Sequence, residues 1–396
     1  MAESKYLVPM SSPEISPEDR LVVLEVLKTI YLSIGPKIEA FEEAVKNYVG
    51  TRHAIGVSSG TSGLHLCVRA AGIQPGDLVI TTPFSFVSSA NVILFENATP
   101  VFVDVDLETG NIDPQKVADA VSDLISKDEK KASRWLPRIG AQQDGELKAI
   151  IPVDVFGQPA DYGLLYKIAK DHHLIMIEDS CEAIGAEFEG KMAGTFGDFG
   201  VFAFYPNKQI TTGEGGMIVT NNDQAAEMIK ALRNQGRAPG DTWLQHTHLG
   251  YNYRLDEMSA ALGLSQMNRI DEMINKRQHV AKLYNQRLSQ IDGIEIPYVS
   301  SKTTRMSWFV YVVRFEKKFS RDKTAAKLEE AGIPVRPYFL PIHLQPYMAI
   351  KYGFREGDYP VTEDLGLRGL ALPFSSSMTE EQVCIVCEKL EQCLTA

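Results

Sequence analysis

Lys208 lies where a lysine can serve as a nucleophile. It follows one apolar run of strand type, 199–204, and precedes another, 217–220, within the segment FYPNKQITTGEGG. Burial between two strands lowers the pKa of a lysine and makes its amine a better nucleophile. A Schiff base with pyridoxal phosphate (PLP) or with a carbonyl substrate requires such an amine. By itself, a lysine beside a glycine-rich turn is more often a solvated loop residue.

An acid ends a second apolar run, LIMIEDSCE at 174–182. A carboxylate at the C-terminal edge of a parallel strand lies where open α/β sheets bind ligands. A PLP enzyme needs a carboxylate against the pyridine nitrogen, because a protonated nitrogen makes the ring an electron sink. Asp179 suits this role better than Glu178, since its side chain is shorter and it comes later, but the sequence leaves the choice open. A helix N-cap explains Asp179 equally well.

The third segment is VSSGTSG at 57–63, between a predicted strand and a predicted helix. Backbone N–H groups and hydroxyls at a helix N-terminus form a phosphate cradle. The motif is neither a Walker loop nor G-x-G-x-x-G, and an ordinary capped helix explains it as well.

Nine motifs occur in the order expected of the DegT family of PLP-dependent sugar aminotransferases. They are SSGTSGLHL, TTPFSFVSSAN, PVFVDVD, PVDVFGQPAD, IEDSCEAIGA, GTFGDFGVFAFYPNKQITTGEGGMIVTN, RNQGR, LGYNYRLDEMSAALGLSQ and RPYFLPIHLQPY. The chain thus resembles this DegT/DnrJ/StrS family over residues 8–390. The resemblance implies an α/β protein of PLP-dependent transferase fold type I, with a large, mostly parallel α/β/α sandwich domain and a small α+β C-terminal domain.

The resemblance also implies roles for single residues. Lys208 corresponds to the lysine that forms the Schiff base and then moves the proton, and Asp179 to the pyridinium partner. Phe86 corresponds to the aromatic residue stacked on the cofactor ring, although a core phenylalanine is the alternative. Glu182 corresponds to a position near the phenolic oxygen of PLP. The phosphate cradle corresponds to Gly60, Thr61 and Ser62.

One departure concerns the phosphate. Many members have a serine five residues before the lysine, where this chain has Ala203. Tyr205 or a water could replace that serine, or fewer side chains hold the phosphate. In relatives the Asn of the GYNYR segment reaches the phosphate of the neighbouring subunit. The resemblance therefore implies a homodimer with shared active sites, in which Asn252 serves the partner; a turn-forming Asn is the alternative.

Four further positions keep two interpretations. Tyr338 and His343 lie in a segment that borders the substrate in relatives, but a Pro-rich aromatic loop is as often structural. Arg254 either has a structural role or pairs with an acidic group. Asp154 ends its strand beside the predicted site, or caps that strand.

The implied reaction moves nitrogen from an amino acid, for which we expect L-glutamate, to a nucleotide-linked keto-sugar. IEDSCEAIGA and GTFGDFG resemble GDP-perosamine synthase-like members, which implies amination at C4 of a 4-keto-6-deoxy sugar for cell-surface polysaccharide or glycoconjugate biosynthesis. Amination at C3 is the alternative. A sugar dehydratase of the family carries His in place of Lys208, and a non-enzymatic regulator would not need the lysine, acid and hydroxyl groups together.

Composition excludes other classes. The 396 residues are 44% apolar, and 51 acidic against 40 basic residues give a net charge of −11, which argues against nucleic acid or an anionic membrane as a partner. No apolar stretch reaches membrane-spanning length and no signal peptide is evident. Five cysteines fit a reducing cytoplasm. Cys384 and Cys387 form a C-x-x-C on an amphipathic helix, which predicts packing thiols and no metal site.

Apolar runs alternate with helical stretches from 54 to 221, which predicts the parallel sheet. We expect a large PLP-binding domain at 1–255 and a linking helix with the small domain at 256–396. The linking helix is predicted at 255–284, a strand at 310–315 and further helices at 320–331 and 379–393. Residues 126–147 are polar and form a predicted solvated insertion, although Trp135 could anchor it to a partner surface.

Overall fold

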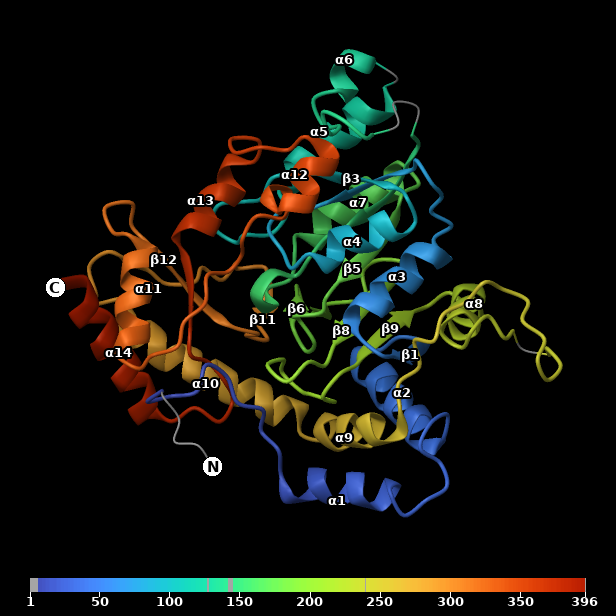
Figure 1. The fold of residues 1–396 in the computed structure, drawn as a ribbon, viewed down its shortest axis with the longest axis horizontal. Helices are drawn as coiled ribbons and strands as arrows, with labels where there is room; N and C mark the ends of the chain where they lie inside the picture. Colours follow the sequence, from blue (N-terminus) through green and yellow to red (C-terminus); the bar gives the residue numbers. More distant parts are fainter. Residues whose placement is uncertain (1–5, 127, 142–144, 239, 396) are drawn as a thin grey trace.

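A seven-stranded sheet forms the centre of the larger domain (Figure 1). The computed structural model describes residues 6–126, 128–141, 145–238 and 240–395. Strand order is β1-β9-β8-β5-β4-β2-β3, and β9 is antiparallel to both neighbours, whereas the pairs from β8 to β3 are parallel. The mostly parallel sheet is therefore confirmed. The strands are β1 (His53–Val57), β2 (Leu78–Thr81), β3 (Thr99–Phe102), β4 (Leu147–Ile151), β5 (Ile175–Asp179), β8 (Phe199–Ala203) and β9 (Gly216–Thr220).

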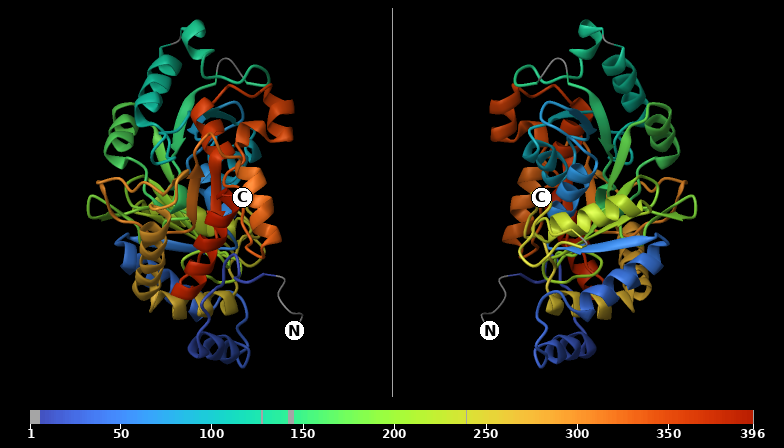
Figure 2. Two further views of the ribbon diagram at one scale, coloured as in Figure 1. Left: turned by 90° about the vertical axis from the view of Figure 1, so that its left-hand side faces the viewer. Right: turned by 90° about the vertical axis from the view of Figure 1, so that its right-hand side faces the viewer.

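Helices cover both faces of this sheet because its strands are apolar on both sides. Alternate strand residues such as Ile177 and Val201 pack with α3, α4 and α8, whereas Met176 packs with α5 and α7. Helices α2 and α9 cover the β8–β9 end of the second face, and α1 packs on α9 at the lower end of the molecule (Figures 1 and 2). The helices are α1 (Pro17–Val26), α2 (Pro36–Val49), α3 (Gly60–Ala70), α4 (Ser88–Phe95), α5 (Pro114–Ile125), α7 (Tyr162–Asp171), α8 (Asp223–Arg233) and α9 (Glu257–Met267).

The small domain has its own apolar core, as predicted for an α+β unit. Its antiparallel sheet has the order β10-β12-β13 and packs against α10, α11 and α14. Ser320 caps α11, its hydroxyl accepting the Lys323 N–H. A third small sheet, β11-β6-β7, joins the domains. The elements are β6 (Glu187–Phe188), β7 (Lys191–Met192), β10 (Ile294–Glu295), β11 (Thr303–Arg305), β12 (Tyr311–Phe315), β13 (Gly369–Leu372), α10 (Ile270–Leu288), α11 (Arg321–Glu330) and α14 (Glu380–Thr395).

The predicted linking helix at 255–284 is wrong in one respect, since it is two helices. Helix α9 ends at Met267 and α10 begins at Ile270. Arg269, in the bend, donates to Glu14 and Asp19 of the N-terminal segment, at 3.2 and 2.9 Å. The bend lets α9 pack in the large domain while α10 crosses to the core of the small domain. Helical periodicity continues through the bend, so the sequence pattern does not reveal it.

The predicted insertion at 126–147 is mostly exposed over its described part. Residues 127 and 142–144 lie outside the described residues. It contains α6 (Glu129–Ala132). The Trp135 ring packs against the α5–α7 core, and its Nε1 donates to Asp123 at 2.9 Å. Trp135 therefore anchors the insertion to α5 of its own chain, whereas most described residues of the segment are exposed, as expected of a solvated insertion.

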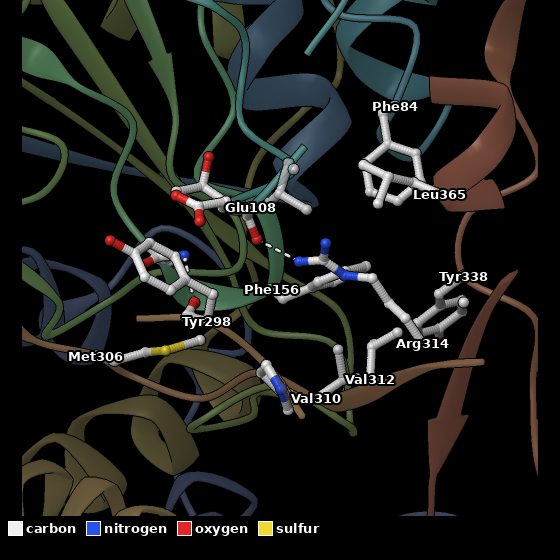
Figure 3. A pocket seen from close by; sticks show the side chains of 16 residues that line it. Phe84, Glu108, Phe156, Tyr298, Met306, Val310, Val312, Arg314, Tyr338 and Leu365 are labelled. Carbon is white, nitrogen blue, oxygen red and sulfur yellow. Dashed lines mark hydrogen bonds between the residues drawn. The ribbon is translucent and has the colours of Figure 1, made fainter. Parts of the chain in front are cut away.

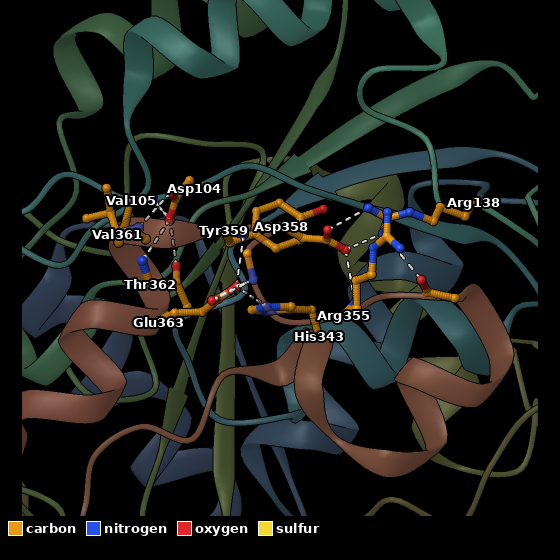
Figure 4. A network of polar contacts seen from close by, with 12 residues as sticks. Asp104, Val105, Arg138, His343, Arg355, Asp358, Tyr359, Val361, Thr362 and Glu363 are labelled. Atoms are coloured by element: carbon orange, nitrogen blue, oxygen red, sulfur yellow. Dashed lines mark hydrogen bonds and ion pairs between the residues drawn. The ribbon is translucent and has the colours of Figure 1, made fainter.

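Residues 338–368 return from the small domain to the large one and carry η2 (Ile342–Leu344), α12 (Pro346–Tyr352) and α13 (Pro360–Arg368). The Asp104 carboxylate, just after β3, accepts the N–H groups of Val361 and Thr362 at 3.0 and 2.9 Å (Figure 4). Arg138 of the insertion holds Asp358 through two hydrogen bonds. This segment is thus pinned to the larger domain at two points.

The described part of the chain was searched for bonded cysteines, metal-binding clusters and membrane-spanning helices. Cys384 and Cys387 are free thiols, and Cys387 is buried in the small-domain core. Among the described residues, no three His, Cys, Asp or Glu side chains could hold a metal ion. None of the helices described is both long and apolar enough to cross a membrane.

A buried carboxylate from α9 caps α2. Glu257 accepts the N–H groups of Gly35, Lys37 and Ile38 at 2.9–3.1 Å. Because Glu257→Ala would orphan these donors, we expect it to lower the free energy of unfolding by about 3 kcal/mol, and Glu257→Gln by about half as much. Urea denaturation measures both, with the exposed Glu272→Ala as control. A Glu257→Ala protein as stable as the control would contradict the capping role.

Candidate active site

The predicted phosphate cradle is the first turn of α3. Ser59 and Ser62 form a capping box, in which each hydroxyl accepts the other residue's N–H. The Ser62 hydroxyl also donates to the Ser59 carbonyl at 2.8 Å, and the Thr61 hydroxyl pairs with Ser88 Oγ at 2.7 Å. The Ser62 hydroxyl is thus engaged within the cap. The N–H groups of Gly60 and Thr61 precede the first intrahelical bond and are the donors at this helix end.

Gly60 keeps this helix end in close contact with the sheet. A Cβ at Gly60 would lie 2.7 Å from Cys181 Sγ and 2.8 Å from Ala203 Cβ, closer than van der Waals contact allows. Cys181 follows β5 and Ala203 ends β8. The first turn of α3 therefore lies against the C-terminal ends of two central strands.

The carboxylates of Asp179 and Glu178 lie in different environments. Glu178 is fully buried and accepts the N–H groups of Gly194 and Gly197 at 2.7 and 2.5 Å. Asp179 is 5% exposed and accepts the Cys181 N–H at 3.3 Å. Burial raises the pKa of Asp179, while hydrogen bonding from Cys181 and the charge of Lys208 lower it. Turns and no helix follow Asp179, which excludes a helix N-cap.

Asp154 supports the turn that carries Asp179. Its carboxylate accepts the hydroxyls of Ser180 and Tyr162 at 2.6 Å and the Ala160 N–H at 2.9 Å. Burial raises the pKa of Asp154 to about 7, although these donors oppose the shift. Asp154 thus caps the end of its strand, which was the alternative to a role in the predicted site.

Lys208 lies between an acid and an aromatic ring. Its Nζ is 3.5 Å from Glu182 Oε1 and 3.7 Å from the centre of the Phe309 ring, and its side chain is 12% exposed. The other Glu182 oxygen accepts the Phe156 N–H at 2.8 Å. Burial raises the pKa of Glu182 and the charge of Lys208 lowers it. The amine and the two carboxylates, Asp179 and Glu182, are thus electrostatically coupled.

Arg277 holds the backbone of Lys208, a role that the sequence did not indicate. The fully buried guanidinium donates to the carbonyls of Lys208 and Asn207 at 2.6 and 3.3 Å, and to those of Trp308 and Phe309 at 3.1 Å. Burial lowers the pKa of Arg277 to about 10. In the sequence, Arg277 is one of several basic residues of the charged helix α10. No local sequence pattern therefore predicts that it binds the backbone of Lys208.

Tyr338 lies in a wall of parallel rings. Its ring centre is 6.3 Å from that of Phe156 and 6.4 Å from that of Phe309. Burial, and then the negative charge of Glu182, raise the pKa of Tyr338. The rings of Phe156 and Tyr338 border a small cavity at the domain junction, lined also by Arg314 (Figure 3). Arg314 donates to the carbonyls of Leu107 and Glu108. Tyr338 therefore lies beside the Lys208 site.

His343 lies in a different environment. Its ring is completely buried, and its Nε2 is 2.9 Å from Glu363 Oε1 (Figure 4). The ring also packs edge-on against Tyr359. No surface of His343 is accessible to a substrate in this conformation, so the structural interpretation of this histidine replaces the substrate contact. Phe86, by contrast, is 64% exposed just before α4, with its ring open to a ligand.

Asn252 faces outward. It forms an isolated β-bridge with Asn234, its side chain is exposed, and no described residue forms a hydrogen bond with that side chain. Tyr251 and Tyr253 on either side stack on each other and pack around His65 of α3. Arg254 donates to the Asn234 side chain at 3.0 Å and so meets an amide. The Asn252 side chain makes no local turn bond and is free to reach another molecule.

This donor set fits PLP. Lys208 offers an amine for the aldehyde, and Asp179 a carboxylate for the ring nitrogen. The N–H groups of Gly60 and Thr61 suit a phosphate, and the Cys181–Ala203 wall keeps that helix end free of side chains. PLP would supply an electron sink at this site.

Comparison with known proteins agrees with this chemistry. The model of the DegT/DnrJ/EryC1/StrS aminotransferase family matches residues 13–391. GDP-perosamine synthase of Caulobacter vibrioides is 36% identical over 391 residues, which cover 98% of each chain. DesV from S. venezuelae, solved in complex with a ketimine intermediate, has a TM-score of 0.85 at 30% identity and covers 97% of this chain and 98% of its own. PseC, a Helicobacter pylori aminotransferase involved in pseudoaminic acid biosynthesis, has a TM-score of 0.87 at 28% identity and covers 98% of this chain and 99% of its own.

The family match spans nearly all of the chain and includes every segment that contributes to the site. Both solved structures match nearly the whole of this chain and of their own. The fold type and the cofactor inferred from the motifs are therefore confirmed. This chain belongs to the DegT/DnrJ/EryC1/StrS family of PLP-dependent sugar aminotransferases.

Proposed function

We propose that the enzyme transfers an amino group from L-glutamate to C4 of a nucleotide-linked 4-keto-6-deoxy sugar, for cell-surface polysaccharide or glycoconjugate biosynthesis. The observation that carries amino transfer is the buried Lys208 amine, 3.5 Å from Glu182 Oε1 and coupled to Asp179. The similarity to GDP-perosamine synthase supports the C4 position and the nucleotide-linked sugar. Amination at C3 is the alternative, and product analysis separates the two.

Each site residue has one task in this proposal. Lys208 would anchor PLP and would hold and move the proton at the substrate carbon. Asp179 would keep the ring nitrogen protonated, and Glu182 would face the phenolic oxygen. Phe86 would stack on the ring and exclude water. Tyr338 borders the space for the sugar.

The phosphate has few donors from its own chain. Gly60 and Thr61 offer N–H groups, Ser62 is engaged in the cap, and Ala203 has no donor. A phosphate dianion calls for more, so we propose that Asn252 of a second copy completes the cradle in a homodimer. Three large apolar side chains are exposed, Ile30 (89% exposed), Trp243 and Leu249 (both 82%), and the last two are close to Asn252 in the sequence.

Lys208→Ala tests the central assignment. We expect turnover to fall about a thousandfold, since the proton carrier is lost, while PLP remains detectably bound through its ring and phosphate contacts. Steady-state assays and cofactor absorbance measure the two effects. Lys191→Ala is the matched control, because Lys191 also lies over a phenylalanine ring, 4.4 Å from its centre, but outside the site. Full turnover by Lys208→Ala, or borohydride fixing PLP to a different lysine of the wild type, would refute the assignment.

The position of amination is tested on the product. Incubation with L-glutamate and a panel of nucleotide-linked keto-sugars should give an amino sugar, and NMR should locate its nitrogen at C4. The expectation follows from the motifs shared with GDP-perosamine synthase-like enzymes. Nitrogen at C3 would favour the alternative.

The shared site is tested by mixing two inactive variants. If each site uses Lys208 of one chain and Asn252 of the other, a mixed dimer of Lys208→Ala with Asn252→Ala has one site with both lesions and one intact site. Provided that Asn252→Ala alone is strongly impaired, mixing should restore activity. If Asn252 served its own chain, each site would keep one lesion and mixing would restore nothing.

A further inference from the structure

The segment that presents Asn252 is fastened to α3 by the tyrosines on either side of it. The rings of Tyr251 and Tyr253 stack on each other, with their centres 5.0 Å apart. The centre of the His65 ring, on α3, lies 4.8 Å from that of Tyr251 and 5.9 Å from that of Tyr253. Side chains alternate along an extended segment, so two rings held on one side turn the residue between them, Asn252, to the other side.

His65 is the centre of this cluster. Its ring is 4% exposed, and its Nε2 and Nδ1 lie 2.7 Å from Glu96 Oε1 and 3.2 Å from the Tyr253 hydroxyl. Burial lowers the pKa of His65, against the effect of Glu96, which favours the neutral ring. A neutral ring that donates from Nε2 to the carboxylate accepts at Nδ1 from the Tyr253 hydroxyl. His65 thus holds the Tyr253 side chain through a hydrogen bond as well as through ring contact.

Glu96, directly after α4, completes the cluster. Its Oε2 accepts from Arg69 Nη1 at 2.7 Å, and its Oε1 also accepts from the Tyr251 hydroxyl at 3.5 Å. Because His65 and Arg69 are four residues apart on α3, both face the same carboxylate. One carboxylate therefore joins α3 to the segment that carries Asn252.

Backbone hydrogen bonds fix the path of the same segment. The N–H groups of Tyr251 and Tyr253 donate to the carbonyls of Leu232 and Arg233, at the end of α8, at 2.7 and 3.0 Å. These bonds remain when any side chain is replaced, so a substitution at His65 removes the ring cluster alone. We therefore expect such a substitution to weaken the placement of the Asn252 amide without abolishing it.

We propose that His65 is a positioning residue for the active site of the partner subunit: it packs on Tyr251 and Tyr253 and so holds Asn252 where the phosphate of the second copy would lie. The inference rests on the proposed shared site. His65 comes five residues after Gly60 on the same helix. It therefore links the phosphate cradle of its own chain to the site of the other chain, and the experiment has to separate these two effects.

The first measurement is the affinity of His65→Ala for PLP. Apo-protein is titrated with PLP, and the absorbance that appears when PLP bonds to Lys208 gives the dissociation constant. We expect binding about tenfold weaker than in wild type, and a larger loss in Asn252→Ala, which lacks the amide itself. His53→Ala is the matched control, because it also removes a histidine paired with a carboxylate, 2.6 Å from Asp223 and outside the site.

Melting and gel filtration of the apo-proteins confirm that each variant is a folded dimer. His65→Leu, which fills part of the space of the ring, replaces His65→Ala in both measurements should the alanine variant not fold.

The second measurement uses mixed dimers to decide which site His65 serves. Subunits of His65→Ala and of Lys208→Ala carry different affinity tags, and dimers with one subunit of each are purified. Only the site with Lys208 gives the absorbance. That site takes Asn252 from the Lys208→Ala chain, in which His65 is intact, while its own α3 lacks the histidine. If His65 acts through Asn252, the mixed dimer binds PLP at this site as tightly as wild type.

An affinity as weak as that of the His65→Ala dimer would overturn the proposal, because the lesion would then act through α3 of the same chain. Binding by His65→Ala equal to that of the His53→Ala control would overturn it as well. Mixed dimers of Asn252→Ala with Lys208→Ala test the shared site by the same absorbance. Recovery there without recovery for His65→Ala would reject this inference alone. Recovery in neither mixture, or a monomeric wild type, would reject the shared site as well.

Discussion

Two carboxylates and one amine are buried together at the C-terminal edge of the central sheet. The positive charge of the amine stabilises the negative charges of the carboxylates, and they stabilise it in turn. Burial raises the pKa of Asp179 and of Glu182, which favours their uncharged forms, and the charge of Lys208 lowers both. Removing one member of such a group leaves an uncompensated buried charge, which costs several kcal/mol. The rest of the site serves to keep these three side chains in place.

The two domains contribute different parts of this support. In the large domain, Asp154 anchors the turn after Asp179, and Gly194 and Gly197 satisfy Glu178. From the small domain, Arg277 binds the Lys208 carbonyl and Phe309 presents its ring to the amine. Since Lys208 is fixed by both domains, a shift between them would move the amine relative to Asp179. The attachments of Asp104 and Arg138 to the 338–368 segment oppose such a shift.

Sequence predicted what local patterns and family motifs encode. Apolar strand runs predict the parallel sheet, and the acidic residues that end β5 are predicted to include the partner of the pyridine nitrogen. The choice between Glu178 and Asp179 needed the sheet, because alternation fixes which one enters the 194–197 loop. The bend at Arg269, the burial of His343 and the role of Arg277 depend on partners distant in the sequence, and no local pattern encodes them. The roles of the site residues toward PLP stay predictions.

We propose that the charge of Lys208 favours the ionised form of Asp179, which would pair with the protonated ring nitrogen of PLP. Nitrogen-15 NMR of the enzyme reconstituted with ring-labelled PLP reports the protonation state of that nitrogen directly. The account predicts a protonated nitrogen at neutral pH in the wild type, and an unprotonated one in an Asp179→Ala variant that still binds PLP. An unprotonated nitrogen in the wild type, or a protonated one in the variant, would contradict it.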